Sequence, residues 1–226
     1  MYHDWDSLGA EREYQRAIEL DPRSPLGYHR YGSYLQLVGR FDESIASFKK
    51  AVAIDPLSLQ SNSLLGIALY LSRQYDDSIE LYRKTVDMDP NYLPARIGLG
   101  LACGQKGMYE EAVAQFRKAG DLADDLVEVV GELGYIYGVS GDISKAQAAL
   151  DELKKWSETA YVSPYNMAKV YAGLGEKGFA FEWLERAYDE RSEWLTWLKV
   201  DPKLDEIRSD PRFRELMHRV GFEPQW

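Results

Sequence analysis

The sequence contains a single cysteine, Cys103, among its 226 residues. One thiol cannot form a disulfide within the chain, and this scarcity fits a reducing compartment such as the cytoplasm. The chain also lacks any run of about 18 apolar residues, the length that a membrane-spanning helix needs. The opening residues are charged within a few positions and do not resemble a signal peptide. We therefore expect a cytoplasmic protein with no membrane partner.

Histidine and positive charge are also scarce. The three histidines, His3, His29 and His218, lie far apart, and none is at ligand spacing from a cysteine, a carboxylate or another histidine. Lys and Arg number 27 against 37 Asp and Glu, so a formal net charge of −10 repels nucleic acid. No glycine-rich phosphate loop occurs. We expect no metal site, no cofactor and no nucleic-acid partner.

A fixed period of 34 residues organises the chain. Asp-Pro occurs at 21–22, 55–56 and 89–90, each pair 34 positions after the last. The same step joins series of small and aromatic residues, which are Gly32, Gly66, Gly100 and Gly134; Gly39, Gly107, Gly141 and Gly175; and Tyr14, Phe48, Tyr82 and Phe116. The second series has one exception, Arg73. Such a period indicates a repeat architecture, in which each unit packs on its neighbours.

Each period predicts two helices. Apolar residues recur at helical spacing over 26–39, and Gly39 stands where a helix commonly ends. A second helix over 41–55 is stopped by Pro56, which cannot continue it. A glycine such as Gly32 inside the first helix costs about 1 kcal/mol relative to alanine, so we expect close helix contact there.

This pattern resembles the tetratricopeptide repeat. The resemblance implies an all-α fold, a right-handed superhelical solenoid of helix pairs with C-terminal capping helices. We assign one array over residues 1–226, with a half repeat at 5–22, repeats at 25–56, 59–90, 93–124, 127–158 and 161–192, and a cap at 193–221. The tail from Tyr161 onward also resembles the repeat region of bacterial multidomain signalling proteins that carry a kinase, cyclase or winged-helix domain.

The two ends carry their own predictions. Residues 10–22 form a second helix with too few residues before it for a first helix and its turn, so we expect Trp5, Tyr14 and Ile18 to form an apolar edge. Either a second copy of the chain or an upstream segment would cover that edge. At the other end, Asp-Pro at 201–202 and 210–211 suits helix starts, with Asp as N-cap. Short capping helices are expected at 194–198, 202–207 and 211–220.

The resemblance also implies a binding groove on the concave face, lined by the first helix of each repeat. The residues at those positions are His29, Arg30, Ser33, Gln36, Gln60, Ser63, Ile67, Tyr70, Ile97, Leu101, Glu128, Glu132, Tyr135, Tyr165, Asn166 and Lys169. The apolar ones among them are expected either to form an exposed strip or to pack inside a tightly curled superhelix. The Lys and Asn clamp of chaperone-binding relatives is absent, which favours an extended or helical apolar peptide as ligand.

We therefore predict a protein–protein interaction scaffold or adaptor that binds a peptide or partner protein, and a homodimer is one of the two ways in which the N-terminal edge would be covered. The alternative is a regulatory or ligand-sensing module cut from a larger bacterial signalling or transcription protein. An enzyme is not expected, because Cys103 falls at a core position and the carboxylate pairs at 76–77 and 110–111 lie at helix starts, where the helix dipole favours them. His29 is either a surface histidine or a polar contact to a partner.

Overall fold

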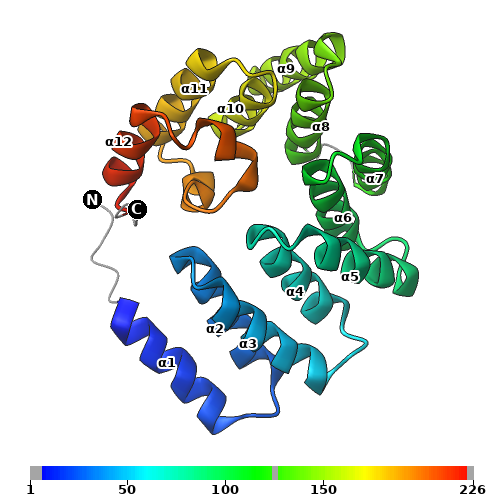
Figure 1. Cartoon of the computed structure of the whole chain (residues 1–226), viewed down its shortest axis with the longest axis vertical. Helices are drawn as coiled ribbons and strands as arrows, with labels where there is room; N and C mark the ends of the chain where they lie inside the picture. The colour runs from blue at the N-terminus through cyan, green and yellow to red at the C-terminus, as the bar shows by residue number, and fades with distance from the viewer. Residues whose placement is uncertain (1–6, 124–126, 223–226) are drawn as a thin grey trace. The chain divides into compact units, whose positions relative to one another are not determined.

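The computed structural model describes residues 7–123 and 127–222, and every regular element in those ranges is a helix (Figure 1). The elements are α1 (Ser7–Leu20), α2 (Pro25–Val38), α3 (Phe41–Ile54), α4 (Leu59–Leu71), α5 (Tyr75–Met88), α6 (Leu93–Gln105), α7 (Tyr109–Leu122), α8 (Val127–Val139), α9 (Ile143–Ser157), α10 (Pro164–Gly173), α11 (Lys177–Asp189), the 3-10 helices η1 (Glu193–Trp197) and η2 (Pro202–Ile207), and α12 (Pro211–Val220). The all-α class predicted from the period is confirmed.

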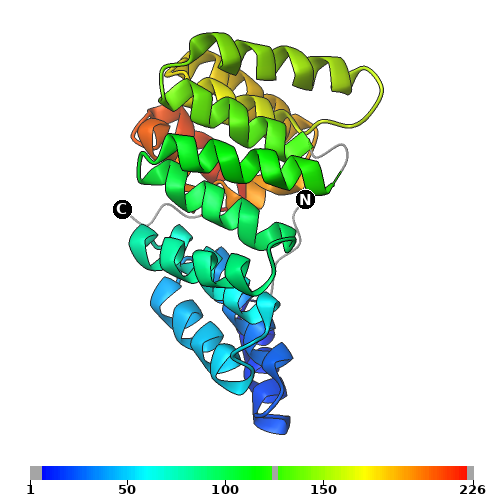
Figure 2. The same cartoon turned by 90° about the vertical axis from the view of Figure 1, so that its right-hand side faces the viewer.

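The chain forms two compact units, which divide inside α6. The first comprises residues 1–102, where α1 packs on α2, α2 on α3, α3 on α4 and α4 on α5. Figures 1 and 2 show these helices side by side. The second comprises residues 103–226, where α8 packs on α9 and α10, and α10 packs on α11 and η2.

Glycine ends the first helix of most pairs, as the period predicts. Gly39, Gly107, Gly141 and Gly175 all adopt left-handed backbone conformations, with φ between 74° and 83°. Arg73 occupies the same position after α4 and has a φ of 63°. A side chain in this region costs about 1–2 kcal/mol, because its Cβ approaches the following carbonyl oxygen. Arg73, the exception in the glycine series, therefore forms the same turn as the glycines, but with a strained backbone.

The glycines inside the first helices mark close contacts between paired helices. A Cβ on Gly32 would lie 2.7 Å from the Phe48 ring, and a Cβ on Gly66 would lie 2.6 Å from the Tyr82 ring. The Ser44 hydroxyl donates to the Gly32 carbonyl oxygen at 2.8 Å, which ties α3 to α2. The close approach expected at these positions is confirmed, and it explains why glycine is tolerated within a helix.

Three short helices follow the last repeat. Asp201 caps η2 by accepting the Lys203 backbone N–H at 3.0 Å, and Asp210 caps α12 by accepting the Arg212 backbone N–H at 3.0 Å. Proline is the first residue of both helices, as predicted. Apolar residues of this segment join the core formed with α10 and α11, namely Leu195, Leu198, Leu204, Ile207, Phe213, Leu216 and Met217.

Candidate peptide-binding groove

An apolar groove of about 460 Å³ lies between α4 and α6 in the first unit. Its lining residues are Gln60, Ser63, Leu64, Ile67, Tyr82, Tyr92, Leu93, Pro94, Ile97, Gly98 and Leu101. Five of them, Gln60, Ser63, Ile67, Ile97 and Leu101, are among the positions predicted from the repeat register. Among residues 7–123 and 127–222, no Asp, Glu, Lys, Arg or His lines the groove. Its walls therefore suit an uncharged ligand group.

Tyr82 of α5 lines the groove, and Gly66 and Gly98 leave the space that its ring needs. A Cβ on Gly98 would lie only 2.1 Å from Cζ of Tyr82, and one on Gly66 would lie 2.6 Å from the same atom. The Tyr82 hydroxyl donates to the Ser63 carbonyl oxygen at 3.1 Å. Burial raises the pKa of the Tyr82 hydroxyl, so it stays a neutral donor. The floor of the groove is thus a fixed aromatic ring.

Ser63 supplies a polar group within these apolar walls. Its side chain is buried, with 8% of its surface exposed, and its Oγ makes no hydrogen bond. A buried hydroxyl without a partner costs about 1–3 kcal/mol. A ligand main-chain N–H or C=O that reached this oxygen would remove the cost, because a hydroxyl both donates and accepts. The groove therefore combines apolar walls with a buried hydroxyl that has no hydrogen-bond partner.

The predicted residues of α2 lie outside this groove. His29 is buried rather than exposed, and its Nε2 lies 2.8 Å from the Ser61 Oγ of α4, so neither surface role expected for it holds. Burial lowers the pKa of His29 and favours the neutral ring. Arg30 is exposed, Ser33 is half-buried, and Gln36 is buried with its Nε2 unbonded.

Two tyrosines expected on an exposed strip are buried. Tyr70 exposes 2% of its surface and packs against Tyr75 with ring centroids 5.9 Å apart. Tyr135 exposes 8%, and its hydroxyl accepts a hydrogen bond from Gln105 Nε2 at 3.2 Å. Neither tyrosine therefore belongs to an exposed strip, and both are buried, which is the alternative stated for these positions.

In the second unit, the predicted groove positions are covered by the chain itself. Glu132, Tyr165, Asn166 and Lys169 all expose 7% of their surface or less, whereas Glu128 is half-buried. The covering element is η2, which packs on α10. This segment therefore occupies the surface that the repeat register assigns to a ligand.

A buried ionic cluster holds η2 in place. Lys169 Nζ lies 2.6 Å from Glu132 Oε1, and Lys203 Nζ of η2 lies 3.2 Å from the same oxygen. Lys203 also lies 3.5 Å from Asp201 Oδ1, and the Tyr165 hydroxyl donates to Asp201 Oδ2 at 2.9 Å. The cluster thus links α8, α10 and η2.

The charges in this cluster support one another. Burial acts to raise the pKa of Glu132, but Lys169 and Lys203 outweigh it and the pKa is lowered. Burial acts to lower the pKa of Lys203, but Asp201 and Glu132 outweigh it and the pKa is raised. Burial also raises the pKa of Tyr165, and Asp201 adds to that effect. Glu132 and Lys203 are therefore ionised at neutral pH.

Sequence reasoning did not find the role of Asp201 and Lys203. The 34-residue step assigns partners only between neighbouring repeats, and these two residues lie beyond the last one. A signal was nevertheless present, since Glu132 carries a charge where the two preceding repeats have Leu64 and Gly98, and Lys169 carries the opposite charge where the two before it have Leu101 and Tyr135. Complementary charges in the tail could have been matched to them.

The predicted self-association edge packs largely within the chain. Tyr14 packs against Tyr34 of α2, with ring centroids 5.6 Å apart. Ile18 lies so close to Gly27 of α2 that a Cβ atom added to this glycine would be 3.0 Å from Ile18 Cγ1. Both side chains thus contact α2, while Trp5 lies outside the described residues. Association through this edge stays a prediction.

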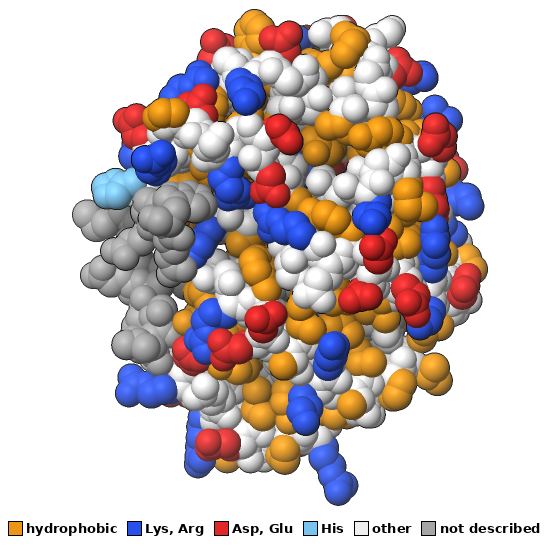
Figure 3. All heavy atoms as spheres, in the orientation of Figure 1, with side chains coloured by type: hydrophobic (Ala, Val, Ile, Leu, Met, Phe, Trp, Pro, Cys, Tyr) orange, Lys and Arg blue, Asp and Glu red, His pale blue; other side chains and the backbone are white. Residues whose placement is uncertain are grey.

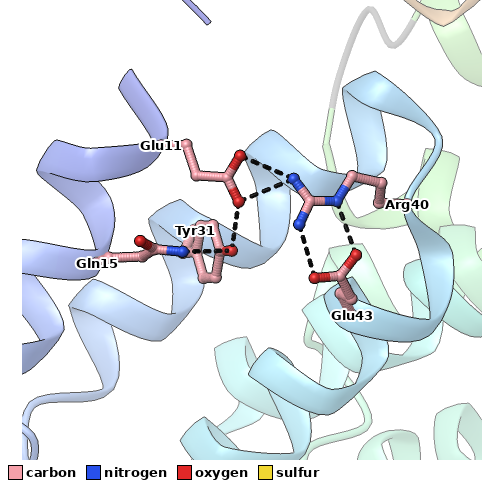
Figure 4. Close-up of polar contacts among 5 residues, drawn as sticks. All are labelled: Glu11, Gln15, Tyr31, Arg40 and Glu43. Atoms are coloured by element: carbon pink, nitrogen blue, oxygen red, sulfur yellow. Dashed lines mark hydrogen bonds and ion pairs between the residues drawn. The ribbon is translucent and has the colours of Figure 1, made fainter. Parts of the chain in front are cut away.

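A polar network fastens α1 to the next helix pair (Figure 4). Glu11 accepts hydrogen bonds from the Tyr31 hydroxyl and from Arg40 Nη1, both at 2.8 Å, and Arg40 also pairs with Glu43 at 2.7 Å. The Tyr31 hydrogen bond and the Arg40 contacts lower the pKa of Glu11. Gln15 donates to the Tyr31 hydroxyl at 3.2 Å. The network fixes the position of α1 on α2.

The remaining chemistry-bearing groups do not assemble into a site. Cys103 is buried, and within 7–123 and 127–222 no group of three or more His, Cys, Asp or Glu residues could hold a metal ion. None of the helices in these ranges is long and apolar enough to cross a membrane. Red and blue side chains are interspersed over the face in Figure 3, without a broad field of one sign.

Comparisons with protein families and solved structures agree with this architecture. Two tetratricopeptide repeat family profiles match residues 27–56 and 63–125. A tetratricopeptide repeat protein from Parabacteroides merdae matches with a TM-score of 0.71 at 14% identity, over 94% of this chain and 77% of that one. The thermophilic repeat protein TTC0263 of Thermus thermophilus matches with a TM-score of 0.62 at 21% identity, over 74% of this chain and 90% of that one.

A third structure matches less closely. YrrB, described as a repeat protein with an unusual peptide-binding site, matches with a TM-score of 0.53 at 17% identity, over 84% of this chain and 98% of that one. No curated protein matches the chain. The similarity to bacterial signalling proteins stays a prediction. Residues 27–56 and 63–125 are tetratricopeptide repeats, and the chain shares its all-α fold with solved proteins of that kind.

Proposed function

We propose that this chain is a protein-interaction module that binds a peptide, or a segment of a partner protein, in the groove between α4 and α6. The observation that carries the proposal is the groove itself, an uncharged hollow of about 460 Å³ with one unpartnered buried hydroxyl. A peptide is the natural ligand for such a site, because it offers apolar side chains and main-chain polar groups together. The peptide-binding site of YrrB, a protein of the same fold, supports this type of ligand.

The groove supports binding rather than catalysis. Its lining offers no carboxylate, imidazole, amine or thiol for general acid–base or nucleophilic chemistry. The Tyr82 hydroxyl is already bonded to the Ser63 carbonyl and has a raised pKa. A ligand held there would meet only apolar surface and hydrogen-bonding groups.

The size of the groove sets the expected affinity. One buried leucine or phenylalanine side chain contributes about 1.5–3 kcal/mol, and one hydrogen bond to Ser63 adds about 0.5–1.5 kcal/mol. A dissociation constant near 1 µM needs about 8 kcal/mol. The partner must therefore make further contacts along the first helices of the neighbouring repeats, and the groove provides the anchor.

Selection of a random peptide library on the immobilised full chain tests this proposal. Recovered peptides are compared on the wild type, on Leu101→Asp in the groove, and on Leu20→Asp as a control. Leu20 is 71% exposed at the end of α1 and does not line the groove. We expect the peptides to bind the wild type and the control and to lose at least about tenfold affinity for Leu101→Asp, because a carboxylate would be desolvated on binding. Equal binding to all three chains would place the site elsewhere.

A further inference from the structure

The second unit shows how this repeat architecture holds a bound segment. The 3-10 helix η2 lies on α10, and Asp201, Pro202, Lys203 and Leu204 are all buried there. Leu204 exposes none of its surface. The segment begins with a capped proline turn, since Asp201 accepts the Lys203 backbone N–H. A short proline-led turn therefore fits against the first helices of two successive repeats.

Positions that are two repeat periods apart are equivalent in the two units. Two 34-residue steps carry α4 onto α8 and α6 onto α10, so that the open groove of the first unit corresponds to the filled surface of the second. In this register Leu64 corresponds to Glu132, and Leu101 corresponds to Lys169. The ion pair that receives the charged turn in the second unit is thus replaced by two half-buried leucines in the first.

Two further replacements shape the open groove. Gly98 stands in the register of Asn166 and makes room for the Tyr82 ring in the groove floor. Ser63 stands in the register of Gly131 and adds the unpartnered hydroxyl to the groove. The open groove therefore has an aromatic floor and a serine hydroxyl at positions where its counterpart has Asn166 and Gly131.

We infer that the partner segment of the α4–α6 groove is a short proline-led turn like residues 201–207 but without charge on the side chains that become buried. This inference rests on the proposed function and specifies its ligand. A lysine in the place of Lys203 would meet two leucines instead of Glu132 and would keep only the aspartate of its own turn, as Lys203 has Asp201. Burying a charge that is only partly compensated is unfavourable. Aliphatic side chains in that place would pack on Leu64 and Leu101, while Ser63 Oγ would bond the main chain of the turn.

Two capped octapeptides test the inference. The first has the sequence of residues 200–207, VDPKLDEI, and the second carries Asp201→Asn and Lys203→Leu. Both keep the acidic pair at 205–206, which is exposed in the structure and keeps the peptides matched in solubility. Titration calorimetry against the full chain should show the neutral peptide binding at least about tenfold more tightly than the charged one, because only the charged one buries a lysine that has lost the Glu132 carboxylate and keeps Asp201 alone as its partner.

A charge exchange in the groove supplies the reciprocal test. The double variant Leu64→Glu with Leu101→Lys gives the first groove the ion pair of the second, and it should reverse the preference in favour of the charged peptide. Circular dichroism checks that the variant is folded, and Leu101→Lys alone replaces it if the double variant is not. The single variant should weaken binding of the neutral peptide at least about tenfold, because its ammonium group would be desolvated in an apolar groove.

The outcomes separate this inference from the proposed function. Equal binding of both peptides, or no change of preference in the variants, overturns the uncharged-turn inference. If neither peptide binds but library peptides depend on Leu101, the groove binds peptides of another shape and only the inference fails. If no library peptide depends on Leu101, the proposed function fails with it.

Discussion

The buried cluster around Glu132 predicts a large and specific effect of one substitution. Glu132→Gln removes the negative charge 2.6 Å from Lys169 and 3.2 Å from Lys203 but keeps the size of the side chain. Lys169 is 3% exposed and would be left without that compensating charge, whereas Lys203 keeps Asp201 at 3.5 Å. Breaking a buried ion pair from one side costs about 3–5 kcal/mol, so we expect a loss of that size in the unfolding free energy.

Removal of both charges should cost less than removal of one. The double variant Glu132→Leu with Lys169→Leu installs the leucine pair found at the same register of the first unit, and an apolar replacement of a buried pair is often nearly neutral. Lys203 still has Asp201 as its partner in that variant. We therefore expect the double variant to be more stable than Glu132→Gln by about 2 kcal/mol, although it alters two residues.

Urea denaturation measures these differences. Tryptophan fluorescence reports on the tail through Trp194 and Trp197 of η1, and circular dichroism reports on the helices as a whole. Glu128→Gln is the matched control, because it removes a half-buried carboxylate one turn earlier on α8 and should change the unfolding free energy by less than about 0.5 kcal/mol. A Glu132→Gln variant as stable as this control, or a double variant less stable than the single one, would refute the account of the cluster.

Three other outcomes follow from the structure. The pKa of Glu132 is lowered below 4.5, and the pKa of Lys203 is raised above 10.5. The stability that the cluster contributes should therefore be complete between pH 4.5 and pH 10.5. This stability should be lost as the pH falls through the folded-state pKa of Glu132, and also as the pH rises through the folded-state pKa of Lys203. Thermal unfolding across pH checks this, and a change centred near pH 7 would contradict it. Arg73→Gly should stabilise the chain by about 0.5–1 kcal/mol, because glycine relieves the left-handed strain at φ 63°; a matched Gly107→Ala change should destabilise it in the same urea assay. Gly98→Ala should cost about 1–3 kcal/mol and weaken peptide binding, because the new Cβ would lie 2.1 Å from the Tyr82 ring in the groove floor; unchanged stability and affinity would show that the ring is free to move.

The helix pairs could be predicted from the sequence because their signals are local. Gly39 ends a helix through its own backbone freedom, and Pro56 cannot continue one, so both act within a few residues of where they stand. A capping aspartate such as Asp210 acts over the same short range. Repetition at a fixed step then multiplies each local signal, which explains why the helices fall where the period places them.

The groove could be predicted only in part. The repeat register places Ser63, Ile67 and Leu101 on successive first helices, and all three line the groove. The register does not show which side chains reach the surface, and Tyr70 is buried although the repeat pattern assigns it to the groove. The hollow above Tyr82 also depends on the distance between two helices, which a sequence does not state.

The sequence by itself thus determined the helix pairs, their order and the capped starts of the tail helices. Only the tertiary structure decided that the tail folds back onto α10 and that Lys203 meets Glu132, because this contact joins residues far apart in the chain and outside the repeating step. Within the first unit, it also left the α4–α6 groove without a segment that corresponds to η2. The physical reason is that local preferences, repeated along the sequence, determine the helix pairs. Burial and charge pairing between residues far apart in the sequence determine which segments pack against those helix pairs.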